Sequence, residues 1–211
     1  MVDKAVGGGA RESETIGRLH HSLMNPLTVV VGYAQLLAAR RDLDEDVRNQ
    51  ATRILEEARE CVRIIERYRH AGGGEGKAEA SLASGSAGPA RRRVLVVDDE
   101  PVILKLSSEV LGSEHDVVGA ADADEAVRRL LTEDFDVVLL DLNLGGRIGG
   151  RRLYETLLVQ QPEVAERVVF VTGGVISEEE QDFINGSGRE CIQKPFHIRV
   201  LRDIVSRGAG E

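Results

Sequence analysis

Acidic side chains and one lysine stand directly after short apolar runs in the second half of this 211-residue chain. The polar residues at these run ends are Asp98, Asp99, Asp141, Thr172 and Lys194. Three carboxylates that are brought together repel one another, so at least one of them should be hard to ionise unless a divalent cation is bound. Magnesium prefers oxygen ligands and commonly bridges carboxylates to phosphate oxygens. We therefore predict a Mg²⁺ site in which Asp98, Asp99 and Asp141 are the protein ligands.

The same residues could carry a phosphoryl group. Phosphoryl transfer to a carboxylate needs an in-line nucleophile and positive charge around the equatorial oxygens. Asp141 would be the nucleophile, Mg²⁺ and Lys194 would supply the charge, and the Thr172 hydroxyl would meet one phosphoryl oxygen. The alternative is that each acidic residue is a solvated cap at the end of a strand, which is a common role for a single Asp. The convergence of all these positions on one edge favours phosphoryl transfer.

The elements that must position these residues follow from the hydrophobic pattern, because short β-branched runs alternate with amphipathic segments. The strands are expected at 94–97, 116–120, 137–140, 168–171 and 190–193, with a helix after each. Right-handed crossovers then give a doubly wound α/β domain with a five-stranded parallel sheet, whose ligands lie beyond the carboxyl ends of the strands. We expect this domain over residues 91–208.

Four segments, VLVVDDE, VVLLDL, VVFVTGG and IQKPF, resemble the receiver domain of two-component response regulators. The resemblance implies that Asp141 is the phosphoacceptor, that Asp98 and Asp99 form the acidic metal pocket, and that Thr172 and Lys194 are switch residues. It also implies that the backbone of Asn143 is a metal ligand. The residues of the VVFVTGG and KPF segments are most similar to those of receivers attached to hybrid sensor kinases.

The chain departs from the receiver pattern at two places. Cys191 stands three residues before the lysine, where receivers usually have an aromatic switch residue, so the usual coupled rotamer switch is not expected. Leu144, Gly145 and Gly146 stand where a Met-Pro-Gly turn is common. We expect a looser loop there.

Upstream, residues 13–70 show helical periodicity in two blocks that break at a charged patch at 40–46. Apolar residues alternate in steps of three and four, which is the seam of a heptad repeat, and the first block contributes Ile16, Leu19, Leu23, Pro26, Val30, Tyr33 and Leu37. The second contributes Val47, Ala51, Ile54, Ala58, Cys61, Ile65 and Tyr68. An antiparallel hairpin alone would leave much of this stripe exposed, so we expect two copies to form a four-helix bundle and the chain to be a homodimer.

This hairpin resembles the histidine-bearing dimerisation domain of sensor kinases, through His21, Asn25, Pro26 and Leu27. By that resemblance His21 is a second phosphoacceptor, and it falls on the solvent side of the heptad seam; the alternative is an ordinary surface histidine. A neutral imidazole is a competent nucleophile near pH 7. Ser22 stands where the family normally has the acidic base for autophosphorylation.

Composition sets the remaining limits. Residues 1–12 are expected to be a disordered tail and 71–90, rich in Gly, Ala and Ser, a flexible linker. No ATP-binding domain fits between 70 and 91, and no Gly-rich nucleotide box occurs, so ATP-dependent kinase activity is not expected. The two cysteines, Cys61 and Cys191, indicate neither a disulfide nor a zinc site.

Charge and hydropathy exclude other classes of protein. The net charge is −9, and residues 91–211 hold 15 basic and 23 acidic side chains, which argues against nucleic acid as a partner. The longest apolar runs are too short to span a membrane, and no signal peptide is evident, so we expect a cytoplasmic protein.

These observations lead to a hypothesis of a dimeric phosphorelay protein with a Mg²⁺-dependent receiver, which shuttles phosphate between His21, Asp141 and outside partners. Those partners would be a sensor histidine kinase or another phosphodonor, and a downstream receiver or phosphotransfer protein. One alternative is an adaptor that pairs with a kinase through its hairpin while only the receiver is phosphorylated. Another is a phosphate sink in which Asp141 discharges to water with help from Asn25.

Overall fold

The computed structural model describes the chain over residues 8–70, 91–173 and 177–208. Within the helices, the side chains at 8–18, 21 and 67–70 fall outside that description. The predicted linker at 71–90 lies wholly outside the described residues, as does the first part of the predicted tail, 1–7.

The N-terminal half is a helical hairpin, α1 (Gly8–Ala39) and α2 (Glu45–His70). Residues 40–44 form the turn, where Arg40 pairs with Asp42 and the Arg48 guanidinium donates to the Leu43 carbonyl. The helix begins at Gly8, so the tail that we expected over 1–12 is too long. Good helix formers such as Ala10, Arg11 and Glu12 precede the apolar stripe, and no helix breaker separates them from it.

The C-terminal half contains a five-stranded sheet in the order β2-β1-β3-β4-β5, and every neighbouring pair is parallel. Its strands are β1 (Arg93–Val97), β2 (Asp116–Ala120), β3 (Val137–Asp141), β4 (Val168–Thr172) and β5 (Cys191–Gln193). The predicted doubly wound sheet is therefore confirmed. The strand limits differ by one residue in places, and Asp141 and Thr172 are the last residues of their strands instead of the first residues after them.

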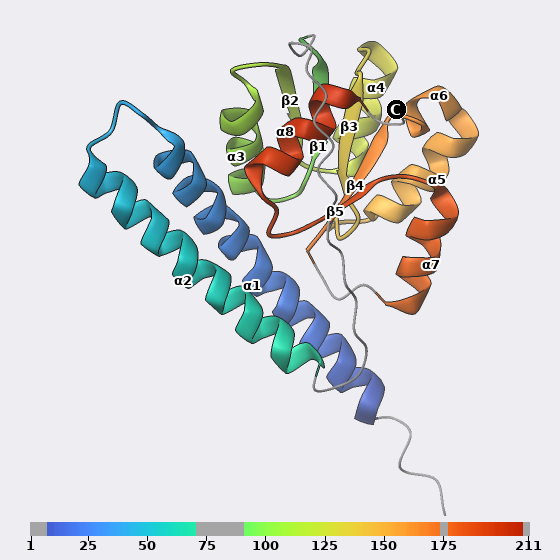
Figure 1. Cartoon of the computed structure of the whole chain (residues 1–211). Coiled ribbons are helices and arrows are strands. Elements are labelled where there is room, and N and C mark those ends of the chain that lie inside the picture. The colour runs from blue at the N-terminus through green and yellow to red at the C-terminus, as the bar shows by residue number, and fades with distance from the viewer. Residues whose placement is uncertain (1–7, 71–90, 174–176, 209–211) are drawn as a thin grey trace, which may run out of the picture.

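Helices cover both faces of the sheet (Figure 1). They are α3 (Pro101–Leu111), α4 (Ala123–Thr132), α5 (Gly150–Gln160), the single turn α6 (Pro162–Ala165), α7 (Glu178–Ser187) and α8 (Ile198–Arg207). Successive strand residues point to opposite faces: Leu95 and Val97 pack in one core with α4, α5 and α7, whereas Val94 and Val96 pack in the other with α3 and α8.

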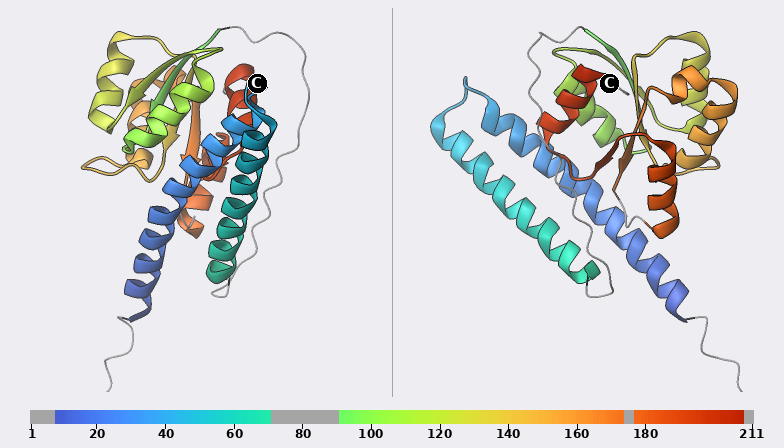
Figure 2. Two further views of the ribbon diagram at one scale, coloured as in Figure 1. Left: turned by 90° about the vertical axis from the view of Figure 1, so that its left-hand side faces the viewer. Right: turned by 45° about the vertical axis from the view of Figure 1, so that its right-hand side comes forward.

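The hairpin lies beside the sheet domain, with α1 nearer to it than α2 (Figures 1 and 2). Helix α1 runs across α3 and meets the start of α8. Tyr33 and Leu36 pack against the core beneath α3 and α8, and Gly32 allows a close approach to Leu106, because a Cβ there would lie 2.6 Å from Leu106 Cδ2. One side of α1 is thus buried by the same chain.

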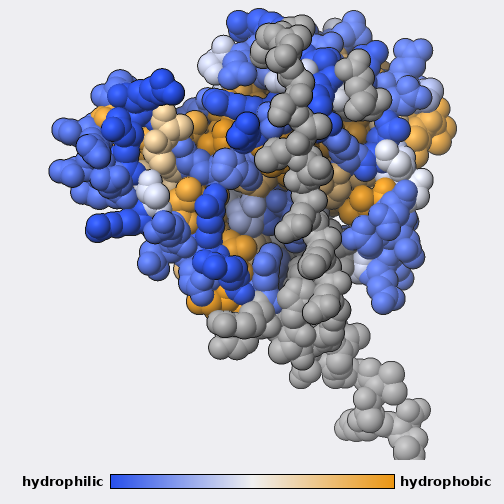
Figure 3. Space-filling model, viewed as in Figure 1, coloured by the Kyte–Doolittle hydropathy of each residue, from blue (hydrophilic) through white to orange (hydrophobic). Residues whose placement is uncertain are grey.

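Much of the heptad stripe stays outside this contact, although Tyr33 packs on the receiver and Ala51 and Ala58 are buried. Six of its residues stay 38–60% exposed in this single chain: Leu19, Leu23, Val30, Leu37, Val47 and Ile54. Apolar side chains are visible among charged ones on the hairpin and along its junction with the sheet domain (Figure 3). The prediction that a single hairpin leaves much of this stripe exposed agrees with these values.

One helical segment among the described residues, Ser22–Ala39, is long and apolar enough to cross a membrane, with a mean hydropathy of 1.3. Polar residues interrupt it, and they are buried against protein: Thr28 donates to the Met24 carbonyl, and Gln35 accepts from the backbone of Ile198. The core helix of a soluble protein passes the same test of length and composition, so this segment is weak evidence for a membrane span.

Candidate phosphoacceptor site

Three carboxylates meet at the carboxyl edge of the sheet. Asp98 and Asp99 follow β1, and Asp141 ends β3, which is the neighbour of β1 in the sheet. One oxygen of each lies within 4.8 Å of the others. Asp98 and Asp141 are 2% and 1% exposed, whereas Asp99 is open to solvent. Two buried acids and one accessible acid at this spacing suit a divalent cation that also keeps water ligands.

Lys194 supplies the only ammonium group seen within bonding distance of the buried acids in the described part of the chain. Its Nζ lies 2.6 Å from Asp98 Oδ2 and 2.7 Å from Asp141 Oδ2, and its side chain is fully buried. The lysine reaches this position because its backbone N–H donates to the Thr172 carbonyl at 2.6 Å, which aligns β5 with the end of β4. A buried ammonium between two carboxylates is held by charge as well as by hydrogen bonds.

The electrostatics of the cluster follow from burial. Burial raises the pKa of Asp98 to about 6, and Asp141 adds to this effect, although the Lys194 ammonium opposes it. Burial lowers the pKa of Lys194, but the charges of Asp141 and Asp98 outweigh burial and raise it overall. The lysine therefore stays charged, while Asp98 is the acid that is hard to ionise without a cation.

Thr172 and Asn143 complete the edge. The Asn143 backbone N–H donates to Asp141 Oδ1 at 2.8 Å, and its side-chain amide lies 3.4 Å from the Thr172 hydroxyl oxygen. Thr172 is 4% exposed. Every residue that the sequence placed in the site is therefore found at one edge of the sheet, with the exception of His21, which belongs to α1.

Two glycines near the site make close contacts that the sequence did not predict. A Cβ at Gly150 would lie 2.0 Å from the Asp141 carbonyl oxygen, so the start of α5 can pack against the end of β3 only with glycine there. A Cβ at Gly145 would lie 2.5 Å from Asp99 Oδ2. The sequence signal was the cluster of glycines a few residues after Asp141, but their contacts depend on the path of the loop.

Cys191 occupies a half-buried position at the start of β5 and packs against the core that contains Phe170. Burial raises the pKa of its thiol to about 11, so the thiol stays protonated near neutral pH. A neutral, half-buried thiol is a small core side chain and is not a reactive nucleophile.

Comparison with known proteins shows the family to which the sheet domain belongs. The sequence matches the response regulator receiver domain over residues 94–206, which is more than half of the chain. This chain belongs to the response regulator receiver family. Residues 11–71 match the His Kinase A (phospho-acceptor) domain.

Relatives of the receiver occur in larger proteins. It is 32% identical over 114 residues to the sensor histidine kinase RcsC of Salmonella typhimurium, covering 54% of this chain but 12% of that protein. It is 38% identical over 123 residues to the transcriptional regulatory protein AruR of Pseudomonas aeruginosa, covering 54% of this chain and 47% of that one. A CheY-like receiver structure from Methanospirillum hungatei matches 56% of this chain and 93% of its own, with 29% identity and a TM-score of 0.50. The chain therefore spans a small part of the RcsC-type kinases.

The hairpin contacts the receiver beside the acidic cluster. Asn25 is 1% exposed, and its amide nitrogen lies 2.5 Å from Oε1 of Glu100, the residue directly after Asp98 and Asp99. A Cβ built on Gly173 would lie 3.2 Å from Asn25 Oδ1 and 3.1 Å from Lys194 Cδ, so the asparagine and the lysine border the same backbone. His21 lies one helical turn before Asn25 in α1, and its side chain is outside the described residues. The neighbouring His20 is buried.

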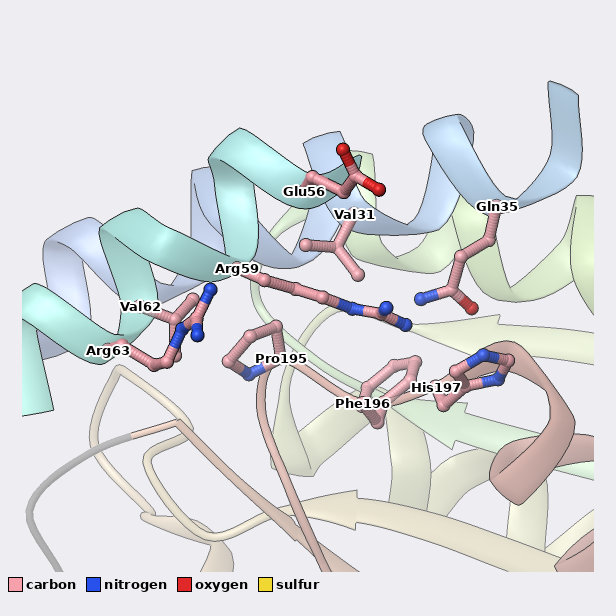
Figure 4. A pocket seen from close by; sticks show the side chains of 9 residues that line it. All are labelled: Val31, Gln35, Glu56, Arg59, Val62, Arg63, Pro195, Phe196 and His197. Atoms are coloured by element: carbon pink, nitrogen blue, oxygen red, sulfur yellow. The ribbon is translucent and has the colours of Figure 1, made fainter. Parts of the chain in front are cut away.

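A groove of about 540 Å³ separates α2 from the loop between β5 and α8 (Figure 4). Its lining includes Val31 and Gln35 of α1, Glu56, Arg59, Val62 and Arg63 of α2, and Pro195, Phe196 and His197 of the loop. Arg59 extends from α2 toward Phe196 and His197. Burial lowers the pKa of His197, and the charge of Arg59 adds to this effect. The groove shows that α1, and not α2, makes the close contact with the receiver.

Proposed function

We propose that this chain is a phosphorelay protein of a two-component system, which takes a phosphoryl group onto Asp141 and exchanges it with His21. The observation that carries the proposal is the pair of short bonds from the Lys194 ammonium to Asp98 and Asp141, beside an acidic cluster with room for a cation. A buried carboxylate next to fixed positive charge supports the proposal, because phosphoryl transfer requires a nucleophile and positive charge around the transferred group.

In the proposed reaction, an Asp141 carboxylate oxygen attacks the phosphorus of a phosphohistidine. The new P–O bond forms as the P–N bond breaks, and the imidazole leaves with the electron pair of that bond. Lys194 and the Thr172 hydroxyl would meet phosphoryl oxygens. Asp98, Asp99, Asp141 and the backbone of Asn143 would hold Mg²⁺, which neutralises charge on the transferred group when it is bound.

The proposed partners follow from this chemistry. A sensor histidine kinase or another phosphodonor would load the chain, and a further receiver or phosphotransfer protein would unload it. The exposed heptad stripe of the hairpin supports a homodimer, because two copies would bury it in a four-helix bundle. We place such a protein in the cytoplasm, where two-component kinases present their histidines.

Two alternatives have an observation of their own. The exposed stripe would equally pair with the dimerisation helices of a sensor kinase, which would make this chain an adaptor whose receiver alone is phosphorylated. The position of Asn25 beside Glu100 and Gly173 would suit a phosphate sink, in which the amide helps water attack the phosphoryl group on Asp141.

The test is incubation of the full chain with a phosphorylated sensor kinase and Mg²⁺. Wild type, Asp141→Ala and His21→Gln are compared for base-labile aspartyl phosphate and acid-labile histidyl phosphate. The relay predicts label on Asp141 and then on His21, with no label of either kind in Asp141→Ala. Label that stays on Asp141 and is unchanged by His21→Gln would leave the adaptor or the sink. If wild type takes no label, the receiver assignment of Asp141 is wrong.

A further inference from the structure

Two polar anchors join α1 to the receiver, alongside the apolar packing of Tyr33, Leu36 and Gly32. Near the phosphoacceptor site, the Asn25 amide donates to Glu100 Oε1 at 2.5 Å. Ten residues along α1, Gln35 Oε1 accepts from the Ile198 backbone N–H at 2.8 Å. Ten helical residues span about 15 Å, so the two anchors fix the direction of α1 across the receiver as well as its position.

The Glu100 carboxylate can accept a hydrogen bond from the hairpin because it makes no capping hydrogen bond in its own helix. Glu100 is the N-cap residue of α3, yet its side chain makes no capping hydrogen bond, and its backbone N–H donates to Asp98 Oδ1 at 2.9 Å. The carboxylate points to α1 while the backbone supports the acidic pocket. One residue therefore connects the two halves of the molecule.

The geometry explains why this bond should matter. Asn25 is 1% exposed in the assembled chain, so water cannot readily replace an acceptor that its amide loses. A hydrogen bond to an ionised carboxylate is also stronger than one between neutral groups. Loss of the Glu100 acceptor should therefore shift the docking equilibrium of the hairpin by about tenfold or more.

We propose that Glu100 is a positioning residue, which acts through Asn25 to hold one turn of α1 over the phosphoacceptor site of the same chain. His21 precedes Asn25 by four residues in a continuous helix, so the bond that fixes Asn25 also fixes the backbone that carries His21. The inference rests on the proposed exchange between His21 and Asp141 and adds its regulation. With Glu100 in place, the hairpin stays docked on the receiver of the same chain. A histidine-bearing protein from outside must then compete with the hairpin for the receiver surface beside Asp141.

The test exchanges the donor and the acceptor of the hydrogen bond between Asn25 and Glu100. Asn25→Asp opposes two carboxylates, whereas the double variant with Asn25→Asp and Glu100→Gln restores a hydrogen bond in which the glutamine donates and the aspartate accepts. Glu100→Ala removes the acceptor, and Glu179→Ala, an exposed charge on α7, is the matched control. All are made in the full chain. Calorimetric Mg²⁺ titration of each variant checks that the acidic pocket is intact.

Two measurements are made on each variant: the radius of gyration by small-angle X-ray scattering, and the rate of phosphoryl exchange between Asp141 and His21 after loading by a phosphorylated kinase. We expect Glu100→Ala and Asn25→Asp to enlarge the radius and to slow the exchange by about tenfold or more. The double variant should restore the smaller radius, and the control should match wild type.

Equal radii for wild type and Glu100→Ala, or a double variant as open as Asn25→Asp alone, would overturn the positioning role. Scattering is measured without phosphate, so it tests the positioning role independently of phosphoryl transfer. A failure of the proposed function would instead be seen as wild-type protein that takes no label on Asp141.

Discussion

At the scale of single residues, the properties of the site come from one lysine that is buried between two carboxylates. The Lys194 ammonium has no solvent exposure, and the two acids that it bridges are 1–3% exposed at their side chains. Removal of one partner from such a cluster leaves buried charge without compensation, which typically costs several kcal/mol.

Lys194→Met keeps the length of the side chain and removes its charge. We expect the free energy of unfolding to fall by about 3–5 kcal/mol in EDTA, because the repulsion between Asp98 and Asp141 is no longer compensated. Stability should recover in part with Mg²⁺, because a bound cation can offset that repulsion. Urea unfolding with and without Mg²⁺ measures both effects. Lys105→Met, at an exposed lysine, is the control and should change stability by less than about 1 kcal/mol. A Lys194→Met protein as stable as the control would contradict the buried cluster.

His115 provides a separate residue-scale test, away from the acidic pocket. It is 1% exposed, its Nδ1 accepts from the Arg92 N–H at 3.3 Å, and burial, together with Arg92, lowers its pKa. The folded state thus favours the neutral ring. Stability from this group is complete above the ordinary pKa of about 6.5 and declines as pH falls below it, by at most about 1.4 kcal/mol at pH 5.5.

His115→Asn retains an acceptor near the Nδ1 position and cannot titrate. Its unfolding free energy should therefore change less between pH 8 and pH 5.5 than that of wild type, with the difference not exceeding about 1.4 kcal/mol. Parallel curves for the two proteins over this range would show that His115 does not contribute to acid sensitivity.

At the scale of elements, the hairpin caps a helix of the receiver. The first N–H groups of an α-helix have no partner within the helix. In α8, the His197 side chain accepts from the Arg199 N–H, and Gln35 of α1 accepts from the Ile198 N–H. Two segments that are far apart in the sequence thus share the N-terminus of one helix.

Gln35→Leu would leave the buried Ile198 N–H without an acceptor, which should weaken docking of the hairpin by about 1–3 kcal/mol. Gln35→Glu keeps an acceptor and places a negative charge at a helix N-terminus, so it should preserve docking. Amide hydrogen exchange at the start of α8 measures the effect. Faster exchange in Gln35→Leu and wild-type exchange in Gln35→Glu are expected, and equal protection in all three proteins would refute the shared cap.

At the scale of the whole molecule, the two sides of the hairpin differ in what covers them. One side of α1 packs on the receiver, and the heptad stripe that includes Leu23 and Ile54 stays 40% and 50% exposed. An apolar stripe of this length on a helical pair usually marks an interface. We expect this stripe to hold two chains together without disturbing the docked receivers.

Leu23→Lys combined with Ile54→Lys places cations across that interface, so the mass in sedimentation velocity should fall from twice 23.0 kDa to 23.0 kDa. Leu131→Lys, at a 68% exposed leucine on α4, is the matched control and should remain dimeric. The helical circular dichroism of the hairpin variant at high concentration should be retained in part through contact with the receiver. A dimeric double variant would place the interface elsewhere.

Much of the fold and of the site was determined by the sequence itself. The alternation of β-branched runs with amphipathic segments predicts a parallel sheet with right-handed crossovers, whereas the strand order came from the structure. That topology brings Asp98, Asp141 and Lys194 to one edge, whatever the details of the loops. The heptad stripe of the hairpin was equally visible, because a period of three and four residues defines one face of a helix.

Other features were decided only by the tertiary structure. The Asn25–Glu100 contact joins residues 75 positions apart, and the Gln35–Ile198 contact joins residues 163 apart. Neither has a local pattern, since each depends on how two separately folded units meet. The close packing of Gly150 on the Asp141 carbonyl is of the same kind. Periodicity reports which face of an element is apolar, but the partner of a polar side chain is fixed by three-dimensional packing, and in this chain that packing brings Asn25 of α1 to the acidic edge of the sheet.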